Sequence, residues 1–137
     1  MYTNGSILLV TMSDLDRYEQ ELLSGWEETY KKGQLPLLIF LSLKDGPKHM
    51  AAIKQFIAHT TNGILKVDDK SMYRALRRYN DAELLEFKQA PGQRGPDRKL
   101  YQLTAPGQRV VGEFVTRNII QVFYQPHIKK LIERDIA

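Results

Sequence analysis

The residues best suited to chemistry are the cations between positions 70 and 81. Positions 70, 74, 77, 78 and 81 share one side of a 3.6-residue spiral, and four of these five are Lys or Arg. An arginine side chain can donate two parallel hydrogen bonds to guanine in the major groove of DNA. Lys70 and Ser71 stand where a helix start favours a phosphate. The segment therefore predicts an anion-facing helix, although a basic helix face also occurs simply as a solvated surface.

Charge is distributed unevenly along the 137 residues. Residues 1–43 have a net charge of −3, residues 44–99 of +5 and residues 100–137 of +2. A basic middle segment indicates a local anionic partner, but lysines and arginines that only solvate helix faces would give the same count. Hydrophobic residues make up 42% and charged residues 26%, which is typical of one folded domain.

Other classes of function receive little support. The chain has no cysteine, which excludes disulfides, thiolate metal sites and a cysteine nucleophile. The three histidines lack metal-ligand spacing, Asp68 and Asp69 suit a helix cap better than a catalytic pair, and the glycines match no phosphate loop. We expect no enzyme activity, no metal and no cofactor. The apolar run 35–43 is too short to cross a membrane, so we expect a cytoplasmic protein with no membrane partner.

Four helices precede the end of the basic segment. The first is expected to begin at Ser13 and to end at Gly33, with Pro36 opening a second, buried helix. A third is expected from Pro47 to the Asn-Gly turn at 62–63. A fourth starts at Asp68 or Asp69.

Extended runs at 84–89 and 99–103 flank a loop with two Gly and two Pro, which predicts a hairpin. Thr104 then caps a last helix, which we expect to be kinked at Pro126. The fold class is mostly α with a small β-hairpin. The order of elements predicts a winged helix-turn-helix domain at 36–104, an N-terminal helical extension at 1–35 and a long C-terminal dimerisation helix at 105–137.

Three stretches carry a resemblance to a known family. They are LLIFLSLKDGPKHMAAIKQFI (37–57), SMYRALRRYNDAELLEF (71–87) and GPDRKLYQLTAPGQRVV (95–111). They resemble the PadR family of transcriptional regulators, over about half the chain. The resemblance implies a homodimeric regulator, usually a repressor, that binds a palindromic operator and responds to small aromatic effectors. Two departures from the family pattern stand out. His49-Met50 stands where many members have Gly-Tyr. Asn80 and Ala82 stand where members usually have Glu and Gly or similar residues, just after the expected fourth helix, which is the DNA-recognition helix of the family.

The expected sites follow from this reading. In the first expected helix, an apolar stripe recurs at spacings of three and four: Leu15, Tyr18, Leu22, Trp26 and Tyr30. This stripe and the last helix are apolar on more of their surface than one core can use, which also predicts a homodimer. The rival hypotheses are a winged-helix protein-interaction module without a DNA target, and RNA binding. The candidate contacts to double-stranded DNA are Lys48, His49, Lys70, Ser71, Tyr73, Arg74, Arg77, Arg78, Gln93, Arg94, Arg98 and Lys99. The candidate ligand pocket comprises Trp26, Tyr30, Phe114, Asn118 and Phe123.

Overall fold

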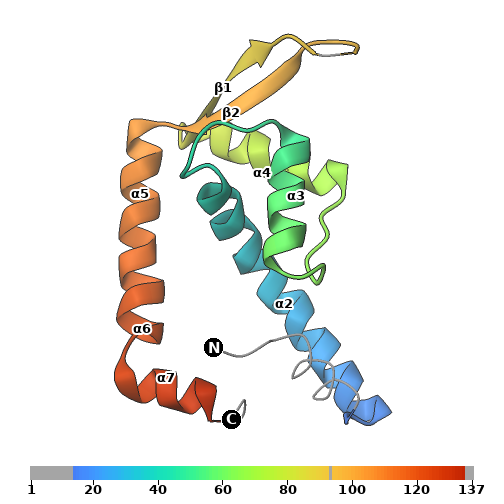
Figure 1. Cartoon of the computed structure of the whole chain (residues 1–137), viewed down its shortest axis with the longest axis vertical. Helices are drawn as coiled ribbons and strands as arrows, with labels where there is room; N and C mark the ends of the chain where they lie inside the picture. Colours follow the sequence, from blue (N-terminus) through green and yellow to red (C-terminus); the bar gives the residue numbers. More distant parts are fainter. Residues whose placement is uncertain (1–13, 93, 135–137) are drawn as a thin grey trace.

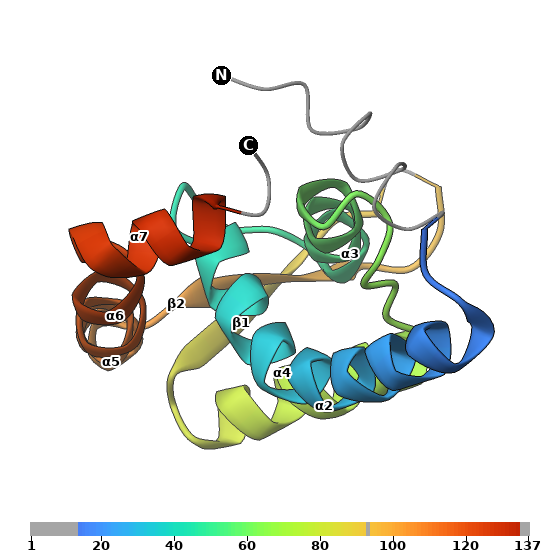
Figure 2. The same cartoon turned by 90° about the horizontal axis from the view of Figure 1, so that it is seen from below.

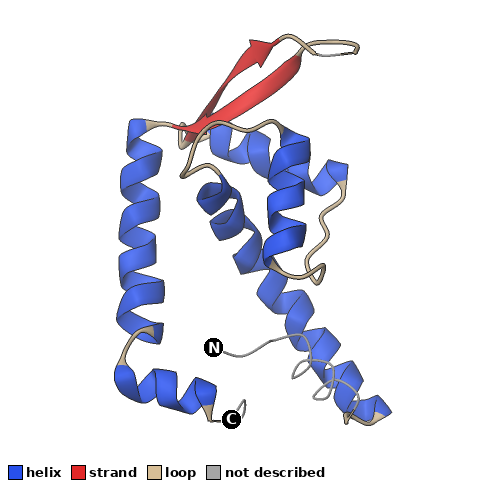
Figure 3. Ribbon diagram, viewed as in Figure 1, coloured by secondary structure: helices blue, strands red, loops and turns tan. Residues whose placement is uncertain are grey.

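The computed structural model describes residues 14–92 and 94–134. These residues form a mostly helical fold with one two-stranded antiparallel sheet, which projects at one end of the molecule (Figures 1 and 3). The expected fold class, mostly α with a small hairpin, is therefore confirmed. No helix among the described residues is long and apolar enough to cross a membrane.

The helix α2 spans Arg17–Ser42. Its N-cap is Asp16, whose Oδ1 accepts a hydrogen bond from the Glu19 backbone N–H at 2.8 Å. The Glu19 Oε1 accepts in return from the Asp16 N–H at 3.0 Å. This reciprocal capping box satisfies two backbone donors that the first turn would leave unpaired. The expected start at Ser13 lies outside the described residues.

The expectation of two helices between residues 13 and 43 is wrong, because α2 continues through both Gly33 and Pro36. Proline in a helix interior removes one backbone hydrogen bond. Here the following turn is buried, with Ile39 at 0% exposure and Phe40 at 9%. Tertiary packing of that turn outweighs the local signal. The position expected to separate an N-terminal extension from the next domain, between 35 and 36, falls inside this helix.

Two further helices, α3 (Met50–Thr60) and α4 (Asp69–Asp81), form the helix-turn-helix. The expected Asn-Gly turn lies between them, with positive φ at Asn62 (53°) and Gly63 (81°). The helix α3 begins at Met50 rather than at Pro47. The reason is that the Lys48 backbone pairs with Tyr101, through N–H···O contacts of 3.0 and 2.9 Å, and is extended.

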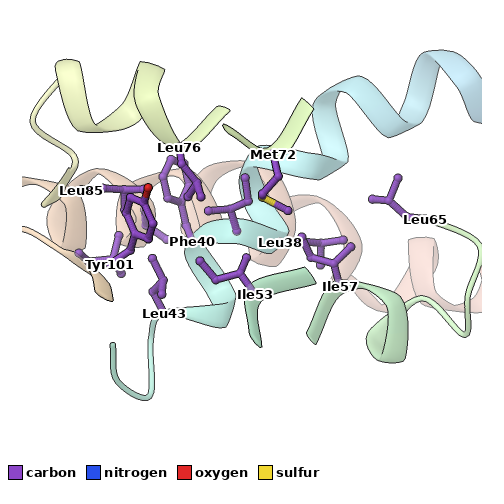
Figure 4. Close-up of a cluster of buried hydrophobic side chains, with 13 residues drawn as sticks. Leu38, Phe40, Leu43, Ile53, Ile57, Leu65, Met72, Leu76, Leu85 and Tyr101 are labelled. Carbon is purple, nitrogen blue, oxygen red and sulfur yellow. The ribbon is translucent and has the colours of Figure 1, made fainter. Parts of the chain in front are cut away.

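The hydrophobic core lies where α2, α3 and α4 meet (Figure 4). Viewed from below, α3 and α4 lie on opposite sides of α2 (Figure 2). Phe40 of α2 meets Tyr79 of α4 edge to face, with ring centroids 4.9 Å apart. The fully buried members of the core, all at 0% exposure, are Ile39, Ile53, Ile57, Met72 and Leu76.

The hairpin, which we call the wing, consists of β1 (Leu85–Ala90) and β2 (Arg98–Leu103). Leu85 pairs with Leu103 and Ala90 with Arg98, so the loop spans the Gly/Pro-rich stretch as expected. At the base of the wing Leu85 and Leu103 are buried, which anchors the hairpin to the core.

The C-terminal segment begins with α5 (Ala105–Val115), which Thr104 caps by accepting from the Gly107 N–H at 3.0 Å. A π-helical turn η1 (Thr116–Ile120) and α6 (Gln121–Phe123) prolong it. The expected kink at Pro126 is wrong, because Gln125 is extended (ψ 136°) and Pro126 starts a separate helix, α7 (Pro126–Glu133). Proline is favoured in a first turn, where its missing N–H costs nothing. Figures 1 and 2 show α7 running across the end of α6.

Candidate nucleic-acid interface

The helix α4 separates its residues sharply by burial. Met72 and Leu76 are fully buried, which fixes the rotation of the helix. The opposite side is exposed and cationic, and its residues are Lys70, Tyr73, Arg74, Arg77 and Arg78. We call this side the basic face of α4.

The start of α4 is set by Asp68. Its Oδ1 accepts from the Ser71 backbone N–H at 2.7 Å, and its Oδ2 accepts from the Ser71 hydroxyl at 3.2 Å. These two hydrogen bonds hold the pKa of Asp68 below its ordinary value, with a smaller contribution from the charge of Arg74. The Ser71 side chain is thus occupied by the cap. At this end Lys54 of α3 also pairs with Asp69 at 2.5 Å, a contact between two helices that no local sequence pattern indicates.

The wing brings three more cations to the same end of the molecule. Arg94, Arg98 and Lys99 are exposed, while Gln93 lies outside the described residues. The Lys99 ammonium sits 4.6 Å from the centre of the Phe87 ring, a cation–π contact that holds it against the strand pair.

Two hollows lie between α4 and the wing. The larger, about 390 Å³, is bordered by the start of α3, by α4 and by the wing. The smaller, about 310 Å³, lies between the last turns of α4 and the wing. Tyr73, Lys99 and Tyr101 line both hollows, so the two adjoin. Tyr73 and Arg77 of the basic face of α4 thus border adjoining hollows together with Arg98 and Lys99 of the wing.

Tyr101 was not among the expected site residues. Burial raises the pKa of its hydroxyl, and the nearby Tyr73 adds to the shift, so Tyr101 stays neutral. The alternation along β2 places Lys99, Tyr101 and Leu103 on one face, and this period of two was the available signal.

Lys48 and His49 precede α3, and each has a structural contact. The Lys48 ammonium donates to the Ser42 carbonyl at the end of α2 and to Asp45 at 2.6 Å. That hydrogen bond and the charge of Lys48 lower the pKa of Asp45. The His49 ring caps α3 and also meets Arg98 of the wing.

The five candidate pocket residues do not line one cavity in the single chain. Trp26 and Tyr30 border a hollow of about 240 Å³ on the N-terminal half of α2. Phe114 borders a different, almost wholly apolar hollow of about 250 Å³ between α2 and α5. Asn118 donates to the Phe114 carbonyl at 3.1 Å within the C-terminal segment. Phe123 is exposed in the same segment.

Two surfaces expose large apolar side chains. The first is the N-terminal half of α2, where Trp26 is 74% exposed. The second runs along α5 to α7. The residues are Tyr18, Leu22, Trp26 and Tyr30 on the first surface, and Val110, Phe114, Ile120, Val122, Phe123, Tyr124, Leu131 and Ile132 on the second.

The helix-turn-helix, the hairpin after it and the basic face beside that hairpin define a winged helix-turn-helix protein. The transcriptional regulator PadR-like family matches residues 39–113, more than half of the chain. The chain belongs to this family of transcriptional regulators, which confirms the resemblance noted in the sequence.

Solved structures agree. A PadR-like transcription factor from Bacteroides fragilis is 28% identical, with a TM-score of 0.57 over 67% of this chain and 86% of that one. A PadR family regulator from Eggerthella lenta is 21% identical, with a TM-score of 0.68 over 86% and 98%. Bacillus subtilis PadR, solved in complex with operator DNA, is 18% identical, with a TM-score of 0.56 over 61% and 48%. No curated protein matches the chain.

Proposed function

We propose that this regulator binds a specific double-stranded DNA operator through the basic face of α4 and the wing. One observation carries the proposal: the cations of α4 are exposed, with Arg77 at the hollow beside the wing, while the other side of the helix is buried. In winged helix-turn-helix proteins this helix enters the major groove. The complex of Bacillus subtilis PadR with operator DNA supports the same use of the fold here.

Within this surface we assign base reading to Arg74 and Arg78 and backbone contact to the wing. Arginine can bind both major-groove acceptors of guanine, and each such contact discriminates against a wrong base by about 1–3 kcal/mol. Arg94 and Arg98 lie on or beside a Gly/Pro loop that can follow the phosphates.

The experiment is a gel shift and a fluorescence-anisotropy titration against duplex DNA from upstream of the protein's own gene. Arg74→Ala and Arg78→Ala should each raise Kd by about tenfold or more, and log affinity should fall linearly with log salt concentration. Arg117→Ala is the control, because Arg117 is an exposed cation on η1, far along the C-terminal segment. If both α4 variants fold and bind as tightly as the wild type, the proposal is wrong. Salt-independent or absent duplex binding would favour the protein-interaction module, and preference for single strands would favour RNA.

We further propose that the protein acts as a homodimeric repressor on a palindromic operator. The two exposed apolar surfaces support this, because each needs a partner and neither contributes to the core of the single chain. A two-fold axis through them would place two α4 helices about one DNA turn, or roughly 34 Å, apart. A reporter gene placed under the operator tests the sign, since a repressor lowers expression and an activator raises it.

We also propose that a small aromatic effector binds beside Trp26, Tyr30 and Phe114 at this dimer contact. The hollows next to these residues are mainly apolar, which suits an aromatic ring. Trp26 is the single tryptophan, so its fluorescence reports on this site alone. Titration with phenolic and other aromatic acids should change the emission of Trp26 and weaken the gel shift together. Emission and gel shift that no tested compound alters would count against the site.

A further inference from the structure

His49 and Arg98 form an exposed contact in which a ring nitrogen and a guanidinium nitrogen face each other. As the N-cap of α3, the His49 ring accepts from the Ala52 backbone N–H through Nδ1 at 3.3 Å. Its other nitrogen, Nε2, lies 3.2 Å from Nη1 of Arg98. A neutral imidazole has one N–H and one acceptor nitrogen, and a guanidinium has donors only.

The two contacts therefore make opposite demands on one ring. If Nδ1 accepts from Ala52, the ring proton is on Nε2 and faces an Arg98 donor. If Nε2 accepts from Arg98, the proton is on Nδ1 and faces the Ala52 donor. The Ala52 N–H also donates to the His49 carbonyl at 3.1 Å, so it has an acceptor in either tautomer. In the tautomer that keeps the Nδ1 cap, Nε2–H and the Arg98 guanidinium are two neighbouring donors on the surface. An external oxygen anion suits this arrangement, because it can accept from Nε2–H and from Arg98 while Nδ1 keeps its cap.

We propose that His49 and Arg98 together bind one phosphate oxygen of the DNA backbone, with His49 in its Nε2–H tautomer. The inference rests on the proposed function, and it assigns the ligand atom and the ring state. The pair lies on the border of the hollow of about 390 Å³, beside Tyr73 of α4. It joins the start of α3 to the wing and is off the basic face of α4, so it meets the backbone rather than the base edges.

The charges around the pair agree with a single bound anion. Arg98 and Lys99 supply two cations to this hollow, and Asp97 is the one carboxylate among its described lining residues. Among the described residues no ion pair joins Asp97 to Arg98. Asp97 thus leaves the two donors free and repels a phosphate. Asp97→Asn should strengthen DNA binding.

The test scans the operator duplex with single neutral methylphosphonate substitutions, using the full chain. The wild type should lose about tenfold in affinity at one backbone position per half-site, as expected for one charge-assisted contact. His49→Asn keeps a good N-cap side chain but shortens the donor. On the unmodified duplex this variant should bind with the same loss of affinity. A methylphosphonate at the sensitive backbone position should then cause no further loss. His59→Asn, at the other end of α3, should behave as the wild type.

The nitrogen NMR shifts of the His49 ring report which ring nitrogen carries the proton. DNA binding would not change these shifts if His49 had only a structural role. In the DNA complex the proton should be on Nε2. If His49→Asn fails to fold, Arg98→Gln provides the same comparison from the wing. Undiminished binding by either folded variant overturns the inference. A second result would also overturn it: no methylphosphonate position lowers the DNA affinity of the wild type, while inorganic phosphate shifts the nitrogen signals of the His49 ring. The anion site would then be unrelated to DNA. Failure of the wild type to bind any duplex would instead refute the proposed function.

Discussion

At the scale of single residues, Asp68 determines how α4 begins and gives a pH-dependent prediction. Its folded-state pKa lies below the ordinary value of 3.8, chiefly because of the hydrogen bond from the Ser71 N–H. As the pH falls, the unfolded chain therefore takes up this proton before the folded chain does. The stabilisation by Asp68 is complete above pH 3.8 and is lost as the pH falls from 3.8 through the lower folded-state pKa.

The variant Asp68→Asn keeps an acceptor oxygen but cannot titrate. Its denaturant midpoint should fall less steeply with pH below 4 than that of the wild type, with little difference at neutral pH. Asp81→Asn, at the other end of the same helix, is the control. If the denaturant midpoints of the wild type and Asp68→Asn fall equally steeply below pH 4, protonation of Asp68 does not affect stability, and the prediction is wrong.

Some site residues could be predicted from sequence and others could not, for a physical reason. The cations of α4 follow from helical periodicity, because Met72 and Leu76 fix which side is buried. The contact of His49 with Arg98 joins positions 49 residues apart and depends on how the wing packs on α3. Nothing local in the sequence reports such a pair.

At the scale of elements, Gly107 shows why α5 can lie against the base of the wing. A Cβ at Gly107 would lie 2.1 Å from the carbonyl oxygen of Leu84 and 3.2 Å from the Oγ1 of Thr104. That carbonyl also accepts from the Thr104 backbone N–H at 3.1 Å, so it cannot move without breaking the junction. The close approach requires glycine on steric grounds.

Gly107→Ala should therefore destabilise the fold by about 1–3 kcal/mol, the usual cost of overpacking. Gly112→Ala makes the same change later on α5, where a Cβ meets nothing within 4 Å. It should be neutral or stabilise the helix by up to about 1 kcal/mol. Thermal or urea unfolding of both variants measures the contrast. Equal stabilities would contradict the packing described at Leu84.

The elements also show where local rules were overridden. The wing, its turn and the caps at Asp68 and Thr104 follow from short-range chemistry, and the structure has them as expected. Pro36 was expected to begin a helix but lies inside one, because the burial of Ile39 and Phe40 holds the backbone helical. A long-range packing energy decided that boundary, and single-sequence periodicity does not report it.

At the scale of the whole molecule, much of the exposed apolar surface lies away from the wing and α4. The wing and α4 lie at one end, whereas the N-terminal half of α2 and the helix α7 lie toward the other (Figure 1). A partner chain that covers the N-terminal half of α2 and α7 would therefore leave the basic face of α4 exposed. Dimerisation would then affect DNA binding by fixing the distance between the basic faces of α4 in the two copies.

Leu22→Glu and Leu131→Glu test this arrangement, because these side chains are 56% and 55% exposed in the single chain. Each variant should fold as well as the wild type but weaken dimerisation by at least about tenfold, since a partner would bury an unpaired carboxylate. Lys130→Glu adds a carboxylate to the opposite face of α7 and should leave the dimer intact. Sedimentation equilibrium gives the assembly state directly.

The same two variants should bind a duplex with a single half-site as well as the wild type does, yet lose the added affinity of a palindrome. If they remain dimeric, or if the wild type is a monomer at all concentrations, the two apolar surfaces do not form the contact between two copies.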